Sequence, residues 1–178
     1  MTRDSQAIDG AARPTRSGAV GKRRLAREMA IQMLYQRDLA ESALAAIFSS
    51  FDVPDFLSER EEGGAARSDA HSRLAEAKDA FEYARRLVEG TVSHLTEVDD
   101  LLSQQADHWR IERMPAVDRN ILRLAVFELV HEPDVPKLVV LDEAVELAKR
   151  FGSDQSARFV NGLLDGLLKT HTFPGSLK

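Results

Sequence analysis

The stretch from Ile121 to Val130 is the feature that most constrains the fold. At about 100° per residue, its apolar side chains surround nearly the whole helical wheel. Such a helix must be covered by neighbours on several sides, so we expect it to be the central element. Pro115 suits the start of this helix, because the first turn needs no N–H, and Pro133 and Pro136 end it.

The rest of the chain shows the same helical period. Besides the central helix, the pattern predicts helices at about Lys22–Leu39, Glu41–Phe51, Leu74–Glu89, Leu95–His108 and Pro136–Arg150, and a last helix capped by Ser153 or Asp154. Gly90 either stops the third of these or lies inside it, since glycine costs a helix only about 1 kcal/mol relative to alanine. Because no segment reads as a strand, the predicted fold class is an all-α bundle.

The predicted organisation is one helical domain with two unstructured segments. Residues 1–21 contain glycine and proline without an apolar period, which predicts a disordered basic N-terminal arm. A charged and glycine-containing stretch predicts a mobile insertion at about residues 55–72. The helical domain then spans residues 22–170, and residues 171–178 form a C-terminal tail.

Charge is unevenly distributed along the chain. The net charge is −5, yet residues 1–27 hold seven basic and two acidic side chains, so this segment carries about +5 and the remainder about −10. A basic segment on an acidic body can bind a polyanion locally. It can equally be a solvated tail that aids solubility, and charge alone does not separate the two.

Residues suited to catalysis or metal binding are scattered. The chain has no cysteine, which excludes disulfides and thiolate metal sites, and its five histidines are spread along the sequence. Glu128 and His131 have the spacing of half a di-iron bundle site, but a single such pair cannot complete one. We therefore expect no enzyme activity, no cofactor and no metal. The absence of a secretory signal or a membrane-length apolar run predicts a cytoplasmic protein that does not enter a membrane.

The polar half of the first helix suggests a binding surface. Arg24, Arg27, Ile31 and Tyr35 lie within about 80° of one another on the wheel. Arginines on an exposed stripe would neutralise phosphates, and a tyrosine would stack on an unpaired base. The alternative is an ordinary amphipathic helix whose tyrosine packs against a neighbour.

The last helix offers a second candidate surface. Gln155, Arg158 and Phe159 share one face at helical spacing, and Phe159 lies at the edge of the core stripe that includes Val160. Phe159 is therefore either a core residue or a ligand-stacking residue. Gly162, inside the same helix, predicts close packing of another backbone against it.

Three segments of the sequence resemble the NusB family. They are Arg23–Tyr35, Asp118–Leu129 with the following Asp134-Val135-Pro136, and Asp142–Gly152 running into Phe159–Asp165. The similarity spans about Lys22 to Lys169. It implies two small helical bundles packed across a shared central helix. It also implies binding of the single-stranded boxA element of ribosomal RNA leaders, together with the small-subunit ribosomal protein NusE, in complexes that modify RNA polymerase.

The resemblance carries over to particular residues. It implies RNA contacts by Lys22, Arg23, Arg24, Arg27, Tyr35, Gln155, Arg158 and Phe159. Gln155 stands where family members often carry an acid, and Arg158 replaces a residue that is often lysine. The N-terminal arm and the 55–72 insertion look longer than usual for the family. The family includes both monomers and homodimers, so the resemblance leaves the oligomeric state of this protein open.

Two other functions compete with RNA binding. A helical module that binds only proteins would make the basic segment incidental, and it predicts no salt-dependent RNA binding. A helix-turn-helix DNA binder would need a recognition helix rich in polar residues that read bases, and no predicted helix has that character.

Overall fold

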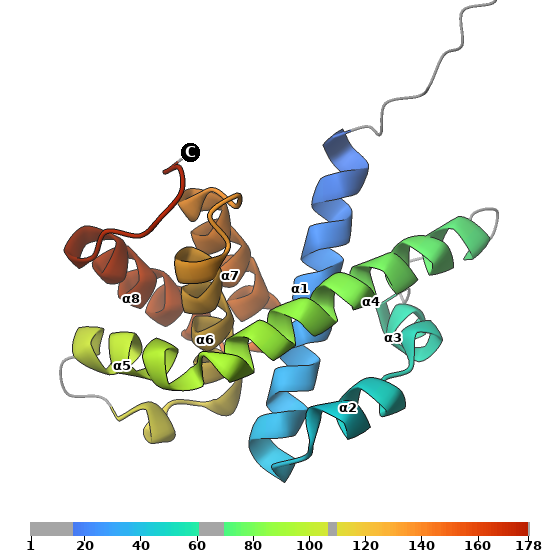
Figure 1. Cartoon of the computed structure of the whole chain (residues 1–178), viewed down its shortest axis with the longest axis horizontal. Helices are drawn as coiled ribbons and strands as arrows, with labels where there is room; N and C mark the ends of the chain where they lie inside the picture. Colours follow the sequence, from blue (N-terminus) through green and yellow to red (C-terminus); the bar gives the residue numbers. More distant parts are fainter. Residues whose placement is uncertain (1–15, 61–69, 107–109, 178) are drawn as a thin grey trace, which may run out of the picture.

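The computed structural model describes residues 16–60, 70–106 and 110–177 (Figure 1). These residues form helices and connecting loops, with no strand among them, which confirms the all-α prediction. The elements are α1 (Arg16–Ala40), α2 (Leu44–Ser50), α3 (Val53–Arg60), α4 (Ala70–Ser93), α5 (Leu95–Gln105), the short 3₁₀ helix η2 (Ile111–Arg113), α6 (Ala116–His131), α7 (Lys137–Phe151) and α8 (Ser156–Thr170). None of these helices is long and apolar enough to cross a membrane.

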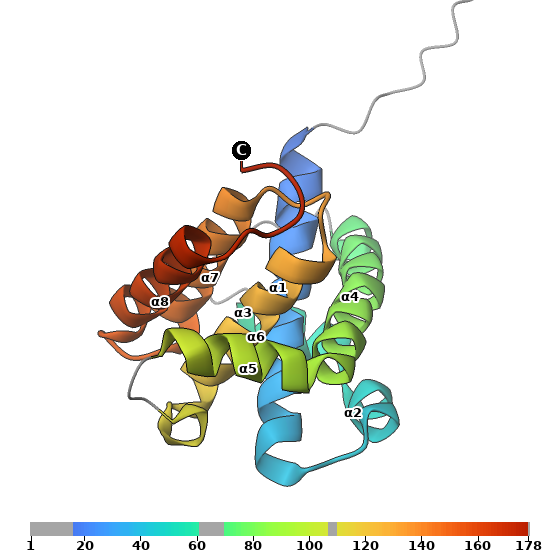
Figure 2. The ribbon, with the colours of Figure 1, turned by 60° about the vertical axis from the view of Figure 1, so that its left-hand side comes forward.

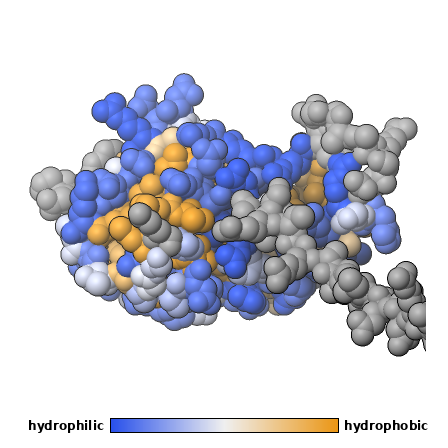
Figure 3. Space-filling view, turned by 90° about the horizontal axis from the view of Figure 1, so that it is seen from above, coloured by the Kyte–Doolittle hydropathy of each residue, from blue (hydrophilic) through white to orange (hydrophobic). Residues whose placement is uncertain are grey.

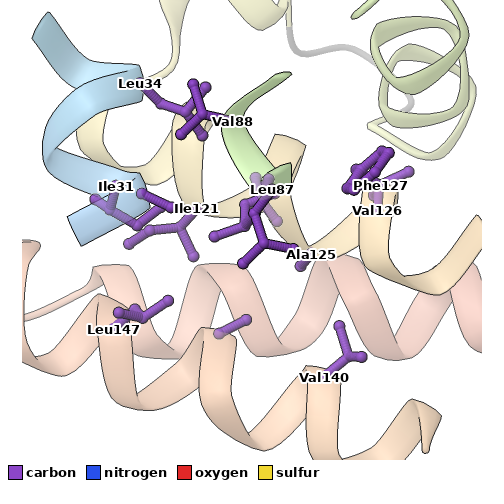
Figure 4. Close-up of a cluster of buried hydrophobic side chains, with 14 of the residues drawn as sticks. Ile31, Leu34, Leu87, Val88, Ile121, Ala125, Val126, Phe127, Val140 and Leu147 are labelled. Atoms are coloured by element: carbon purple, nitrogen blue, oxygen red, sulfur yellow. The ribbon is translucent and has the colours of Figure 1, made fainter. Parts of the chain in front are cut away.

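Helix α6 is the central element, as its apolar pattern predicts. It packs against α1 and α4 on one side and against α5, α7 and α8 on the other, so two groups of helices share it (Figures 1 and 2). In Figure 4, Ile121 of α6 lies among side chains from other helices, including Ile31 of α1, Leu87 of α4 and Leu147 of α7. Ile121 and Phe127 of α6 are both almost fully buried.

Gly90 lies inside α4 rather than at its end. A Cβ atom added there would come within 2.1 Å of Cζ of Phe127, which leaves no room for any other residue. The glycine therefore lets α4 pass close to α6, and the benefit of this packing outweighs the small helical cost of glycine. Helix α4 ends only at Ser93, and α5 follows after the single residue His94.

Helix α1 begins six residues earlier than the predicted Lys22. The apolar pattern starts only after residue 22, but no proline lies between Arg16 and Ala40, so the helix can extend back to Arg16. The prediction of a disordered arm is therefore wrong for residues 16–21. Residues 1–15 lie outside the part of the chain that the structure describes.

The prediction of a mobile insertion at residues 55–72 is wrong at both ends of that range, because helices occupy them. Helix α3 includes residues 55–60, and α4 begins at Ala70, while residues 61–69 are not described. Val53 and Phe56 of α3 are buried, and the Phe56 ring lies 5.7 Å from the Phe51 ring. The sequence does hold a signal for α3, because Asp52 accepts a hydrogen bond from the Asp55 N–H at 2.9 Å, and Pro54 suits a first turn.

Two predictions for the last helix also fail. Neither Ser153 nor Asp154 is its cap, because α8 begins at Ser156, and Gln155 precedes it without a side-chain capping bond. Gly162 is exposed, and a Cβ added there would meet nothing within 4 Å, so no backbone packs closely against it. The core stripe of α8 is as predicted, with Val160, Leu163, Leu164 and Leu167 buried.

Candidate nucleic-acid interface

Arg27 is buried and does not belong to an exposed stripe. Only 2% of its side chain is exposed, and its guanidinium donates to both carboxylate oxygens of Glu128 on α6, with Nη2–Oε1 at 2.7 Å and Nε–Oε2 at 2.9 Å. Ile31 is buried as well. The predicted stripe fails because α6 and α7 cover this side of α1, which the wheel of an isolated helix cannot reveal.

The Arg27–Glu128 pair explains why a charged residue can occupy the central helix. Burial would lower the pKa of Arg27, but the nearby Glu128 carboxylate outweighs that effect and holds the pKa above its ordinary value. Each charge satisfies the other in a bidentate arrangement, which is the geometry that makes a buried ion pair tolerable. Arg27 is thus a structural residue, and Glu128 is not available for the metal pairing that its spacing with His131 suggested.

Arg24 lies at the border between core and solvent. Its side chain is 43% exposed, and its Nε and Nη2 atoms donate three hydrogen bonds to the Glu143 carboxylate of α7, the shortest from Nη2 to Oε1 at 2.7 Å. The hydrogen bond to Glu143 is the main reason that the pKa of Arg24 is raised. Arg24 can therefore meet a phosphate only by sharing its charge with Glu143.

Two further basic residues, Lys22 and Arg23, precede Arg24 on α1. Lys22 Nζ contacts Asp79 Oδ2 of α4 at 2.8 Å, while the Arg23 side chain is exposed. Both residues line a cavity of about 500 Å³ between α1 and α4, together with Tyr83 and Arg86. Arg86 is exposed, and sequence reasoning missed it because only the bounds of the predicted Leu74–Glu89 helix were considered.

Aromatic side chains are accessible on both candidate surfaces. Tyr35 on α1 is 39% exposed, and Phe159 on α8 is half-buried at the edge of the core. Gln155 and Arg158 are exposed beside Phe159. Helix α7 packs against both α1 and α8, so it lies between the two groups of candidate side chains. The sequence reasoning did not predict this arrangement.

A second cationic cluster lies next to Arg24. Arg60, Lys149 and Arg150 line a cavity of about 280 Å³ with Arg24 and with the acids Glu28, Glu143 and Glu146. Glu28 is buried, which raises its pKa, and Arg60 at 3.2 Å and Arg150 at 3.7 Å partly offset that effect. Sequence reasoning missed Arg60 because it fell within the expected mobile insertion.

The fold and these side chains define a class: a small helical protein with basic and aromatic groups on two neighbouring surfaces. A sequence profile of the NusB family matches residues 24–169, and the chain belongs to that family. "Transcription antitermination protein NusB" of Myxococcus xanthus (strain DK1622) is 42% identical over 146 residues, which cover 82% of this chain and 94% of that protein. The protein of the same name from Geobacter sp. (strain M21) is 45% identical over 154 residues, covering 84% and 96%.

Solved structures agree with this membership. A structure described as "T. maritima NusB" superposes with a TM-score of 0.62 at 34% identity and covers 84% of this chain and 92% of that one. A crystal structure of "Antitermination Factors NusB and NusE in complex with dsRNA" gives a TM-score of 0.64 at 28% identity, with 85% and 98% covered. The two groups of helices around α6 fit the arrangement that the resemblance implies.

Proposed function

We propose that this protein is a non-catalytic, RNA-binding transcription antitermination factor. It binds single-stranded boxA elements of ribosomal RNA leaders together with NusE, and it supports ribosomal RNA transcription and processing in the cytoplasm. The proposal rests on membership in the NusB family, whose relatives are named transcription antitermination proteins. A structural neighbour combines NusB and NusE with double-stranded RNA in one crystal, which supports NusE and RNA as the two kinds of partner.

The observation that carries the proposal is the exposure of basic and aromatic side chains on α1 and α8, within or directly beside the matched residues 24–169. Arg23, Tyr35 and Arg158 are exposed, and Arg24 and Phe159 are partly exposed. Guanidinium groups neutralise phosphates and release counterions, while each stacked base contributes about 1–3 kcal/mol. Stacking requires unpaired bases, so these side chains favour a single strand over a duplex.

A protein partner has a suitable surface elsewhere. Leu138 and Val139 at the start of α7 and Leu177 near the C-terminus are large apolar side chains that remain exposed. Figure 3 shows apolar surface gathered on the half of the molecule that holds α7 and α8. Such exposed patches often mark protein interfaces. NusE and the RNA polymerase antitermination complex are the partners we propose, and the chain acts as a monomer or a homodimer.

One observation favours a module that binds only proteins. Lys22, Arg24 and Arg27 are all paired with carboxylates of other helices, so part of the cationic charge on α1 serves the fold. If the protein binds only other proteins, the remaining exposed cations are ordinary solvated residues with no role in binding RNA.

A binding titration separates the two functions. Fluorescence anisotropy would be measured with a labelled boxA-like single strand, a scrambled strand of equal length, and a hairpin that pairs the boxA bases, at several salt concentrations. We expect the boxA strand to bind most tightly, with an affinity that falls as salt rises and increases when NusE is present. Equal binding of all three RNAs would contradict boxA recognition. NusE binding without any RNA binding would establish the protein-only module.

A further inference from the structure

His94, Glu97 and His131 come together where α4, α5 and α6 meet. His94 is the residue between α4 and α5, Glu97 lies on the first turn of α5, and His131 is the last residue of α6. One ligand atom from each lies within 4.8 Å of the others. The His131 Nε2 and Glu97 Oε2 atoms are 2.9 Å apart, and the two histidine rings lie 3.9 Å apart between centroids.

The orientation of His94 leaves one ring nitrogen free to act as a ligand. Its Nδ1 lies 2.9 Å from the carbonyl oxygen of Gly90. A carbonyl only accepts hydrogen bonds, so Nδ1 carries the proton and the lone pair is on Nε2. Histidines that bind metals usually donate their second N–H in this way, which fixes both the tautomer and the ring direction. The Gly90 carbonyl thus prepares His94 for coordination.

We propose that His94, Glu97 and His131 bind a divalent transition-metal ion, with zinc as the best match. Two imidazoles and one carboxylate form a ligand set that zinc accepts in a tetrahedral site. Tetrahedral zinc at ordinary bond lengths places its ligand atoms roughly 3.4 Å apart, so small rotations of these side chains close the site. The Glu97 side chain is 48% exposed, and solvent can therefore supply the fourth ligand.

Metal binding would also crosslink separate elements of the fold. The three ligands come from the junction between α4 and α5, from the first turn of α5 and from the last residue of α6. The bound ion would fasten the α4–α5 junction to the end of α6.

The experiment uses the full chain, stripped of metal with a chelator and titrated with Zn²⁺ alone in a calorimeter. We expect one ion per chain, and a weakening of about tenfold or more in His94→Asn and in His131→Gln. Glu97→Gln removes an exposed ligand with little risk to folding, and it should also weaken binding. The matched control is the His71→Gln/His171→Gln double variant, because both histidines lie outside the cluster, and it should bind Zn²⁺ like the parent.

A second measurement covers the case in which a histidine variant folds poorly. Zn²⁺ should raise the thermal midpoint of the parent and of the control, and should raise that of Glu97→Gln less. The proposal is overturned if the parent shows no saturable binding. It is equally overturned if the cluster variants bind like the parent, or if the control variant alone loses the site.

Discussion

At the scale of single residues, the arginines of α1 divide into structural and accessible groups. Arg27 and Arg23 are four residues apart, yet Arg27 is buried against Glu128 while Arg23 is exposed. Arg23 lies between Lys22 and Arg24, and Arg27 lies between Ala26 and Glu28, so the neighbours in the sequence do not show which arginine is buried. Only the position of α6 distinguishes them, since its Glu128 needs a cation in the core.

Arg27→Ala should therefore act on stability rather than on RNA binding. Removing one partner leaves the Glu128 charge buried and unpaired, which costs about 3–5 kcal/mol of the free energy of unfolding. Replacing both residues, as in Arg27→Met/Glu128→Leu, should recover much of that loss. Urea unfolding measures both values. A fully stable Arg27→Ala variant that binds RNA poorly would show that Arg27 contacts RNA after all.

Arg23→Ala should show the opposite profile. Its exposed side chain contributes little to stability, but the loss of one phosphate contact should weaken RNA binding across sequences and reduce the salt slope by about one. Anisotropy titrations at several salt concentrations measure that slope. Exposed Arg113 on η2 is a matched control far along the chain, and Arg113→Ala should leave the slope unchanged.

Phe159 remains a predicted binding residue. Leu163, on the core stripe, is buried, so Leu163→Ala should cost about 2–5 kcal/mol of unfolding free energy. Phe159 is only half-buried, and Phe159→Ala should cost less stability while weakening RNA binding by about 1–3 kcal/mol. Urea unfolding and RNA affinity measured for both variants decide the question. If Phe159→Ala is as unstable as Leu163→Ala and its folded fraction binds RNA normally, Phe159 is a core residue.

At the scale of elements, the helices that were predicted well are those with a long apolar period. Helix α6 was identified as central because Leu122 and Val126 continue its apolar pattern around the wheel, and both are fully buried. Helix α3 was missed because its eight residues are too short to show a period, and its signal lies in the Asp52 cap. The ion pairs between helices were not predictable, because spacing along one helix says nothing about which helix covers it.

Helix α3 should contribute to stability although it was expected to be mobile. Phe56 is buried against the ring of Phe51, so Phe56→Ala should cost about 3–5 kcal/mol of unfolding free energy. The exposed Ser58 of the same helix offers a control, since Ser58→Ala should change stability little. Thermal and urea unfolding would show whether α3 belongs to the cooperative core, and an unchanged Phe56→Ala variant would mean that it does not.

The end of α1 is tied to α6 by Asp38, and this tie should depend on pH. Burial raises the pKa of Asp38, but hydrogen bonding and the charges of Arg119 and Arg123 outweigh it and hold the pKa below its ordinary value. A carboxylate whose pKa is lowered on folding stabilises the folded state fully at pH values above the pKa of the unfolded chain, which is about 3.9. This stabilisation is lost as the pH falls through the lower pKa of the folded state.

The Asp38→Asn variant tests this tie. At pH 7 it should lose about 1–3 kcal/mol of unfolding free energy, because Arg119 and Arg123 lose a charged acceptor. As the pH falls below about 3.9 and through the lowered pKa of the folded state, the difference from the parent should shrink, since the parent's carboxyl group becomes protonated. Urea unfolding across pH provides the curve, and exposed Asp134→Asn is the control. A difference that stays constant down to acid pH would exclude a role for the Asp38 charge.

At the scale of the whole molecule, charge is concentrated where the chain enters its first helix. Residues 1–15 hold two basic and two acidic side chains, so they add no net charge, whereas Arg16 to Arg27 hold five basic side chains. The excess over residues 1–27 therefore comes almost entirely from α1. The acidic remainder of the molecule repels polyanions, so RNA should approach at this end.

Deleting residues 1–15 should consequently change RNA binding little. The deletion leaves the net charge and the exposed cations of α1 intact, so the slope of log affinity against log salt should stay within the error of the parent. Arg23→Ala/Arg24→Ala, which removes two cations from α1 and keeps the N-terminal segment, should flatten the slope instead. Anisotropy titrations of both variants with the same boxA-like strand provide the comparison. A slope reduced by about two in the deletion alone would place the phosphate contacts at Arg3 and Arg13, and the electrostatic contribution would then lie outside the helical domain.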